Sequence, residues 1–234
     1  MQTRALIFDI GGSVFDWHTA IVEALEQVVP AQVRSHLDLA SFAYACRDKF
    51  LTLNAAVMKG DRAWMTSDQM LASVVKELCA GQGLGDLAPA SIDILSKAWR
   101  NMPAWPGARE GIAALRRKYM VAPLTILSWP MAVGSSRRNG IDWDSILSCD
   151  VLGIYKPDPR VFARAAEIID CLPEEIMMVA AHPSDLRAAM KAGYRSAYVM
   201  PQLEDPGEDY TDTGFAREFD VVAKDFADLA RQIA

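Results

Sequence analysis

Five side chains that can do chemistry each follow an apolar, strand-like stretch of the sequence: Asp9, Ser128, Lys156, His182 and Asp185. In a parallel α/β sheet the carboxyl ends of the strands share one edge, so residues far apart in the chain can meet in one crevice there. A carboxylate held ionised at such an edge can attack carbon or phosphorus and form a covalent intermediate. The pattern therefore predicts a single site with Asp9 as its central carboxylate.

The other residues of this predicted site would supply charge and hydrogen bonds. Lys156 would bring a positive charge that keeps neighbouring carboxylates ionised. Ser128, together with the backbone amides near Ser13, could bind an anionic group or a developing oxyanion. Asp185 could orient Lys156 or activate a water molecule.

Each of the five residues also has a purely structural interpretation. Asp9 can open a turn, because Asp and Gly are common turn residues, and Ser128 can cap the turn that follows it. Lys156 can be an ordinary surface lysine. Asp185 can be a helix N-terminal residue favoured by the helix dipole, and His182 a hydrogen-bonded loop histidine. Their joint placement favours a site more than any one of them does.

Alternating strands and helices are expected to position these residues. The elements predicted outside the segment 17–100 are strands at 5–8, 121–127, 174–181, 196–200 and 220–222, a short apolar element at 146–154, and helices at 108–119, 160–169, 185–192 and 225–233. Strands that alternate with helices imply parallel pairing and a doubly wound sheet. The predicted fold class is therefore α/β with a Rossmann-like core, and a polar surface loop is expected at 204–213.

The segment 17–100 is predicted to be an all-helical insertion. Its hydrophobic periodicity favours helices at 18–29, 37–57, 67–78 and 91–99, with no convincing strand. The predicted domains are thus a Rossmann-like core at 1–16 and 101–234 and a helical cap at 17–100 over the loop face of the sheet. Large apolar side chains of the cap could line a pocket over Asp9, although such residues more often fill helix cores: Trp17, Trp64, Met65, Met70 and Trp99.

Composition restricts the expected partners. The chain has 234 residues and a net charge of -6, which argues against a nucleic-acid-binding surface. No apolar run approaches the ~20 residues needed to span a bilayer, and the N-terminus lacks the features of a signal peptide. The cysteines form no C-x-x-C pair, so free thiols in a reducing cytoplasm are expected rather than a disulfide framework or a metal site.

Four segments occur in the order of the four motifs of the haloacid dehalogenase superfamily. They are FDIGGSVFDW at 8–17, ILS at 126–128, IYKPDPRVF at 154–162 and MVAAHPSDL at 178–186. The chain resembles most closely the type II (S)-2-haloacid dehalogenases, across the Rossmann-like core and weakly into the cap. This motif set is specific for the superfamily and less specific for the reaction.

The resemblance implies a hydrolase that works without a cofactor or a metal. Asp9 would displace halide from C2 of a short haloacid, which gives an ester on the enzyme and inverts the carbon centre. Water would then attack the carbonyl of that ester, supported by Lys156 and Asp185, and release the 2-hydroxy acid. Ser13 and Ser128 match positions that hold the substrate carboxylate or the nucleophile. The resemblance also implies a small carboxylic acid as substrate and a homodimer.

Several positions depart from the pattern of those dehalogenases. Gly11 stands where an aromatic residue is usual, and Trp129 replaces an Asn, which removes an amide and adds bulk. His182 also stands where Asn is usual, and Phe162 replaces a Tyr. The cap arginine that receives the halide is best matched by Arg47, for which a solvated helix arginine is the alternative. The candidate substrate-binding residues are Ser13, Arg47, Ser128, Trp129 and His182.

Two other functions remain open at the level of sequence. A Mg²⁺-dependent phosphatase of the same superfamily would need a second acid two residues after the nucleophile and another acid in the fourth motif. Gly11 and Ala181 stand at those positions, which leaves a poor Mg²⁺ site. A member without turnover could instead bind a small acid or a partner, because fold does not fix function. Gly11 and Trp129 favour this second alternative.

Overall fold

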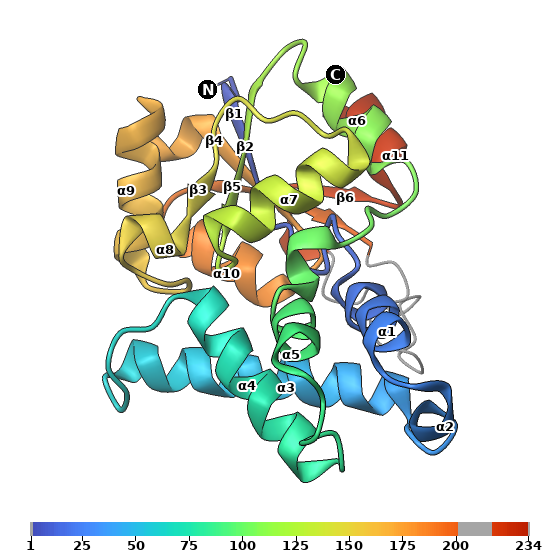
Figure 1. The fold of residues 1–234 in the computed structure, drawn as a ribbon. Coiled ribbons are helices and arrows are strands. Elements are labelled where there is room, and N and C mark those ends of the chain that lie inside the picture. The colour runs from blue at the N-terminus through green and yellow to red at the C-terminus, as the bar shows by residue number, and fades with distance from the viewer. Residues whose placement is uncertain (1, 201–216, 234) are drawn as a thin grey trace.

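The computed structural model describes residues 2–200 and 217–233. Within these residues, six strands form one parallel sheet in the order β3-β2-β1-β4-β5-β6 (Figure 1). The strands are β1 (Ala5–Phe8), β2 (Met120–Thr125), β3 (Leu147–Ser148), β4 (Ile176–Ala180), β5 (Arg195–Val199) and β6 (Val221–Ala223). The chain runs outward from β1 through β2 to β3 and resumes at β4 on the other side of β1. This reversal puts the topological switch point, where α/β folds bind ligands, at the carboxyl end of β1.

Helices cover both faces of the sheet, which confirms the predicted doubly wound α/β class. The helices on one face are α6 (Ala108–Leu115), α7 (Trp129–Asn139) and α11 (Phe226–Ile233), and those on the other are α9 (Pro159–Ile169) and α10 (Pro183–Lys191). This division follows from right-handed crossovers between parallel strands. With helices on both sides, β1 and β4 are buried along their whole length, which explains their uninterrupted apolar sequences.

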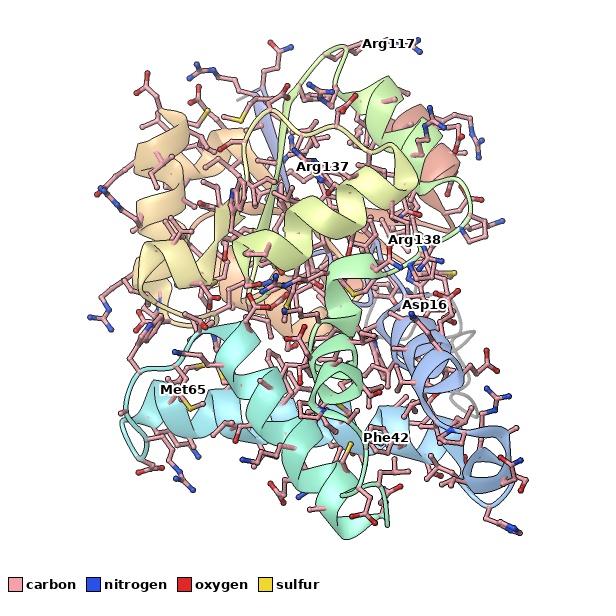
Figure 2. The ribbon with its side chains drawn as sticks, in the orientation of Figure 1. Asp16, Phe42, Met65, Arg117, Arg137 and Arg138 are labelled. Carbon is pink, nitrogen blue, oxygen red and sulfur yellow. The ribbon has the colours of Figure 1, made fainter. Side chains whose placement is uncertain are left out.

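The cap helices follow β1 and pack against one another beyond the sheet (Figure 1). They are α1 (Trp17–Val28), α2 (Ala31–Arg34), α3 (Leu39–Lys59), α4 (Ser67–Gly81) and α5 (Pro89–Ser96), followed by the 3-10 helix η1 (Ala98–Asn101). Asp16 caps α1, because its carboxylate accepts the amide of Thr19 at 2.9 Å (Figure 2). The helical insertion is confirmed, and the domain boundaries at residues 16 and 100 stay a prediction.

A buried polar cluster joins the cap to the core. The Ser67 amide donates to both carboxylate oxygens of Asp150 at 3.1 Å, and the Tyr155 hydroxyl is hydrogen-bonded to the same carboxylate. Ser67 starts α4, and Asp150 lies in the short helix α8 (Cys149–Leu152). The indole of Trp64 stacks on Tyr155 with ring centroids 4.8 Å apart. We call Ser67, Asp150 and Tyr155 the Asp150 cluster, and it fixes α4 against the core.

Helix α7 is a difference from the sequence prediction, which contains no helix between residues 129 and 139. The segment is rich in Ser and Arg and lacks a continuous apolar stripe, so its periodicity is weak. The helix starts because the Ser128 hydroxyl accepts the amide of Met131 at 3.3 Å and Pro130 occupies the first turn.

Two further elements near the site have different bounds from those predicted. The strand expected at 121–127 ends at Thr125, whose hydroxyl accepts the amide of Leu127 at 3.1 Å. The apolar element expected at 146–154 is divided into the short strand β3 and the helix α8. The loop expected at 204–213 lies outside the described residues. Among residues 2–200 and 217–233, no helix has the length and apolar character needed to cross a membrane.

Candidate active site

Asp9 lies directly after β1, at the switch point of the sheet. Its amide donates to the carbonyl of Val179 at 2.9 Å, which extends the pairing of β1 with β4 by one residue. Gly12 has a φ of 84°, a left-handed conformation that suits glycine, and this turns the chain back toward Asp9. The Ser13 hydroxyl therefore donates to Oδ2 of Asp9 at 2.7 Å and accepts the amide of Ala181 at 3.0 Å. The carboxylate is held by backbone and side chain together.

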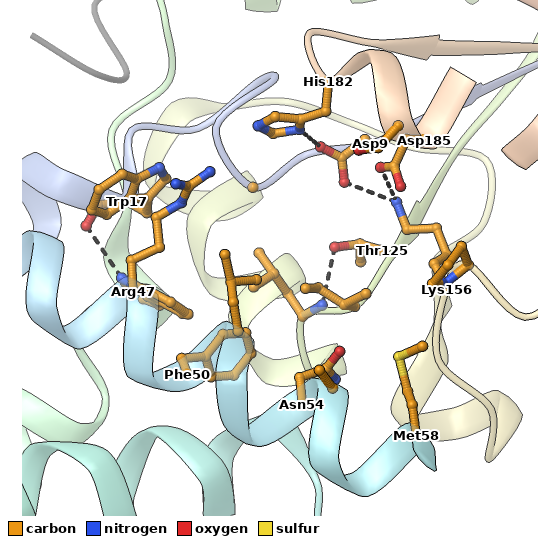
Figure 3. Close-up of a pocket in the computed structure, with 18 residues that line it drawn as sticks. Asp9, Trp17, Arg47, Phe50, Asn54, Met58, Thr125, Lys156, His182 and Asp185 are labelled. Carbon is orange, nitrogen blue, oxygen red and sulfur yellow. Dashed lines mark hydrogen bonds and ion pairs between the residues drawn. The ribbon is translucent and has the colours of Figure 1, made fainter. Parts of the chain in front are cut away.

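Lys156 joins Asp9 to the far end of the sequence. Its Nζ lies 3.0 Å from Oδ1 of Asp9 and 2.6 Å from Oδ2 of Asp185, which belongs to the first turn of α10 (Figure 3). The side chains of Lys156 and Asp9 are only 3% and 6% exposed. Nδ1 of His182, which precedes α10, lies 3.1 Å from Oδ2 of Asp9. The structure thus brings together four of the residues that the sequence analysis placed in one crevice.

Opposite charges decide the ionisation of this group. Burial by itself raises the pKa of Asp9, but the Lys156 charge and the hydrogen bond to His182 outweigh it, so that pKa lies well below its ordinary value. Burial by itself lowers the pKa of Lys156, and the two carboxylates reverse this shift. The pKa of Asp185 is raised, because burial and the nearby Asp9 charge outweigh the attraction of Lys156. At neutral pH, Asp9 is therefore an anion and Lys156 a cation.

A cavity of about 400 Å³ separates this charged group from the cap. The cap wall consists of residues three or four positions apart on α3, which places them on one helix face: Arg47, Phe50, Leu51, Asn54, Ala55 and Met58. Figure 3 shows Asn54 and Met58 across the cavity from Asp9 and Lys156. The wall on the core side includes Gly11 and the residues just after β2. The pocket is thus charged at one end and mainly apolar elsewhere.

Arg47 brings a second positive charge to the cavity from the cap. Its guanidinium carbon lies 4.8 Å from the centre of the Trp17 ring, within the range of a cation–π interaction (Figure 3). The indole N–H of Trp99 donates to the carbonyl of Trp17 at 3.2 Å, which ties the start of α1 to the end of the cap. All three side chains line the cavity, so for Trp17 and Trp99 the less common of the two roles considered from sequence applies.

A family model of haloacid dehalogenase-like hydrolases matches residues 3–193. The chain belongs to this family. It is 27% identical to the (S)-2-haloacid dehalogenase 4A of Burkholderia cepacia, over 87% of this chain and 85% of that protein. The crystal structure of the L-2-haloacid dehalogenase PA0810 is similar, with a TM-score of 0.90 at 29% identity, over 99% of this chain and 98% of that chain. The defluorinating L-2-haloacid dehalogenase Rha0230 gives a TM-score of 0.89 at 29% identity, over 99% and 95%.

These findings confirm the family predicted from the four motifs, and with it a hydrolase. The matched region of the family model includes the whole helical cap and extends through α10. The two similar crystal structures extend over nearly the full length of both chains, so the fold likeness includes cap and core. Family membership leaves the role of each site residue to be argued from the geometry.

Two predicted substrate-binding residues, Ser128 and Trp129, are not brought to the cavity. In the described part of the chain the cavity is lined instead by the three residues before them, 125–127. The Ser128 hydroxyl caps α7, and the Trp129 side chain is 49% exposed to solvent. β2 ends at Thr125, and the two residues that follow it, rather than Ser128 and Trp129, lie on the cavity wall.

Three of the cap residues that were named as candidates for the pocket lie elsewhere. Trp64 stacks on Tyr155, Met70 is fully buried in the packing of α4, and the Met65 carbonyl accepts a hydrogen bond from the Tyr155 hydroxyl at 2.9 Å. Trp64 and Met65 thus serve the contact between cap and core through Tyr155. The more common structural role of Met and Trp side chains applies to all three.

Sequence reasoning missed Asn54 and Met58, which lie on the cavity wall. A signal for them exists in the sequence, because they follow Arg47 by seven and eleven positions and so share its helix face. That signal depends on Arg47 pointing into the site, which the sequence alone left open.

The charged group also contains atoms that could ligate a metal. Asp9, His182 and Asp185 each offer one ligand atom, and these atoms lie within 4.8 Å of one another. The Lys156 ammonium, however, already bridges both carboxylates, and one of the three ligands is a nitrogen. Mg²⁺ prefers near-octahedral oxygen ligation, so these residues fit it poorly.

Proposed function

We propose that this chain hydrolyses the carbon–halide bond of 2-haloacids, with Asp9 as the nucleophile. The observation that carries the proposal is the arrangement around that carboxylate: it is buried, ionised, and hydrogen-bonded to Ser13, His182 and Lys156 beside a cavity. A carboxylate fixed in this way reacts without having to shed a loose shell of water. The similarity to an (S)-2-haloacid dehalogenase supports the reaction type.

In the first step, an oxygen of Asp9 forms a bond to C2 of the substrate while the carbon–halide bond breaks. The bonding electron pair leaves with the halide, and attack from the opposite side inverts C2. Arg47 is placed to receive the halide, because it brings a positive charge to the cap wall of the same cavity. Ser13 and His182 orient the nucleophile through its other oxygen, Oδ2. The product of this step is an ester on Asp9.

In the second step, water attacks the carbonyl carbon of that ester. Ester formation removes the negative charge of Asp9, and that charge is one cause of the raised pKa of Asp185. Asp185 then becomes a more fully ionised base, held 2.6 Å from Lys156, that accepts a proton from the water. That proton passes to the departing alkoxide, which leaves as a 2-hydroxy acid. The other proton of the water remains on the Asp9 carboxyl and is released to solvent, which regenerates the carboxylate. The chemistry of both steps is carried by side chains of this chain, without a cofactor.

Two parts of this proposal concern the protein beyond its active site. We retain the homodimer implied by the resemblance and a cytoplasmic location as predictions. Size-exclusion chromatography with light scattering tests the first, and fractionation of the source cells tests the second.

Halide release from racemic 2-chloropropionate tests the proposed function. We expect the wild-type protein to release chloride and leave one enantiomer, and the Asp9→Asn variant to lose at least about 10⁴-fold in rate. Parallel assays with p-nitrophenyl phosphate, with and without Mg²⁺, test the phosphatase alternative. Phosphate release without chloride release would contradict the proposal. If neither chloride nor phosphate is released, but 2-chloropropionate raises the thermal stability of the protein, a binding protein would be favoured.

A further inference from the structure

The cavity beside Asp9 is larger than a short 2-haloacid requires. Its volume of about 400 Å³ falls within the roughly 300–1,000 Å³ of pockets that enclose drug-sized ligands, whereas 2-chloropropionate has only a handful of non-hydrogen atoms. Asp9, Lys156 and Asp185 gather at one end (Figure 3), so the proposed function places C2 of the substrate at that end. The remaining volume is available to the group carried on C2.

That remaining volume has mainly apolar walls. Phe50, Leu51 and Met58 line it from α3, and Trp99 and Leu127 line it from the end of the cap and the core. Leu51 and Met58 are 39% and 40% exposed, so both keep apolar surface that a ligand can cover. Burial of that surface favours an apolar substituent.

Gly11 adds to this space without being required by the backbone. Its φ lies outside the left-handed region, so the chain could carry a side chain at this position. A Cβ built there would meet Leu127 Cδ1 at 3.4 Å as its nearest neighbour, which is close to an ordinary contact. The missing side chain therefore leaves room in the cavity next to the nucleophile.

Asn54 supplies a polar group on the cap wall that lacks a partner in the described protein. The residue is 5% exposed, and its Nδ2 has no hydrogen-bond partner among the described residues. Buried polar groups in native proteins are nearly always hydrogen-bonded, and an unpaired donor is unfavourable. Asn54 lines the cavity across from Asp9 (Figure 3), but Nδ2 itself is enclosed by protein. An acceptor on a bound ligand can therefore satisfy the amide when the side chain rotates about its last bond and exchanges its nitrogen and oxygen.

We propose that the substrates of this site are 2-haloacids whose C2 carries a bulky, mostly apolar group with a hydrogen-bond acceptor that Asn54 binds. This inference rests on the proposed function and specifies its substrate class. Asn54 then determines specificity through the distant end of the substrate, while Gly11 leaves the space that the bulky group occupies. The reacting end of the substrate is held by the charged group around Asp9.

Three substrates test the proposal in one halide-release assay. They are 2-bromopropionate, 2-bromohexanoate, and 2-bromo-4-methoxybutanoate, in which an ether oxygen replaces one methylene of the hexanoate. We expect kcat/KM to rise about tenfold or more from the propionate to the hexanoate, because the longer chain buries more apolar surface. We expect a further rise of about fivefold for the methoxy compound, from one hydrogen bond to Asn54.

Two variants on α3 separate the hydrogen bond from general packing. Asn54→Leu keeps the volume and removes the amide, so the advantage of the methoxy compound should disappear, mainly through KM. Met58→Leu, on the same helix face, is the matched control and should keep that advantage. Gly11→Phe fills the added space and should lower the ratio of hexanoate to propionate turnover. Thermal unfolding of each variant shows whether it is folded.

The outcomes distinguish this inference from the function on which it rests. Turnover of 2-bromopropionate with no gain for the larger acids would overturn the inference and leave the proposed function standing. A methoxy advantage that survives in Asn54→Leu would overturn the role of Asn54. If no substrate releases bromide, the proposed function fails. In that case, stabilisation of the Asp9→Asn variant by 2-bromohexanoate but not by 2-bromopropionate would still support the large apolar pocket.

Discussion

The site around Asp9 and the Asp150 cluster are both polar groups built on an aspartate, but Asp9 is buried, Asp150 is half-buried, and their partners differ. Asp9 has a lysine at 3.0 Å and lines the cavity. Asp150 instead accepts hydrogen bonds from neutral donors, the Ser67 amide and the Tyr155 hydroxyl, at the contact of cap and core. Burial raises the pKa of both carboxyls, but only for Asp9 is the shift reversed, by Lys156 first and then by His182.

The comparison shows what separates a reactive carboxylate from a structural one in this fold. Burial alone favours the protonated acid, which is a poor nucleophile. A buried cation keeps the carboxylate ionised, and a cavity beside it admits a substrate that the carboxylate can attack. Within the described residues, Asp150 forms no ion pair with a lysine or arginine and does not line the cavity beside Asp9; it instead joins α4 to the core. The two aspartates should therefore respond differently to the loss of their partners.

Of the changes considered, removal of the Lys156 ammonium should have the largest effect on activity. In the Lys156→Met variant, burial would dominate and raise the pKa of Asp9, so kcat/KM at neutral pH should fall by at least about 100-fold. In the wild type Asp9 stays ionised even below the ordinary pKa of Asp, so activity should persist to low pH. In Lys156→Met the acid limb of the pH–rate profile should move to higher pH. Measurement of kcat/KM across pH 4 to 9 would detect the shift.

The Lys156→Arg variant is the control for this prediction, because it keeps the positive charge but changes its geometry. Its acid limb should stay close to that of the wild type even if its rate is lower. The uncompensated carboxylates in Lys156→Met should also cost about 3–5 kcal/mol of stability, measured by urea unfolding. An acid limb that does not move in Lys156→Met would contradict the role given to the lysine.

Loss of a neutral partner at the Asp150 cluster should affect stability more than catalysis. Tyr155→Phe removes the hydroxyl that is bonded to Asp150, and we expect a loss of about 1–3 kcal/mol in the free energy of unfolding. The rate of halide release should change little, because the hydroxyl that is removed is hydrogen-bonded within the Asp150 cluster and to the Met65 carbonyl, and its partners among the described residues do not include the charged group around Asp9. Urea unfolding and kcat measured on the same preparation would check both. If Tyr155→Phe lost as much activity as Lys156→Met, the distinction between the site around Asp9 and the Asp150 cluster would be wrong.

The smallest expected effect is a difference between the wild type and Asp150→Asn in how the free energy of unfolding depends on pH. The pKa of Asp150 is raised by burial, so its contribution to stability declines as pH rises from about 4, the ordinary pKa of Asp, through the raised value. In Asp150→Asn this decline is absent, so the variant should gain on the wild type as pH increases across that window. Unfolding free energies at several pH values would show it. A constant difference between the two proteins would contradict the raised pKa.

The charged end of the site can be predicted from the sequence because its geometry follows from strand ends. Asp9 lies at the end of β1 and Asp185 in the first turn of the helix after β4, whereas Lys156 lies in the loop that follows β3 and the short helix α8. Parallel pairing around a switch point brings such positions to one edge of the sheet, whatever the length of the intervening loops. The helical cap is predictable for a similar reason, because its periodicity differs from that of the strands around it.

The cavity walls could not be predicted to the same degree, because they depend on small shifts of the elements. β2 ends at Thr125, two residues earlier than expected, and residues 125–127 lie on the wall while Ser128 caps α7. On α3, the side chains that face Asp9 depend on the rotation of the helix and on how the cap docks, for which the sequence has no local signal. The unpaired amide of Asn54 becomes visible only when that docking is known.

A single turnover in oxygen-18 water, with enzyme in excess over 2-chloropropionate, tests the central claim most directly. If Asp9 forms the ester, the oxygen that reaches C2 comes from its carboxylate. The first-turnover 2-hydroxy acid should then be unlabelled at C2, and peptide mass spectrometry should find the label on Asp9. A labelled first-turnover product with unlabelled Asp9 would mean that water attacks C2 directly, and would contradict the account.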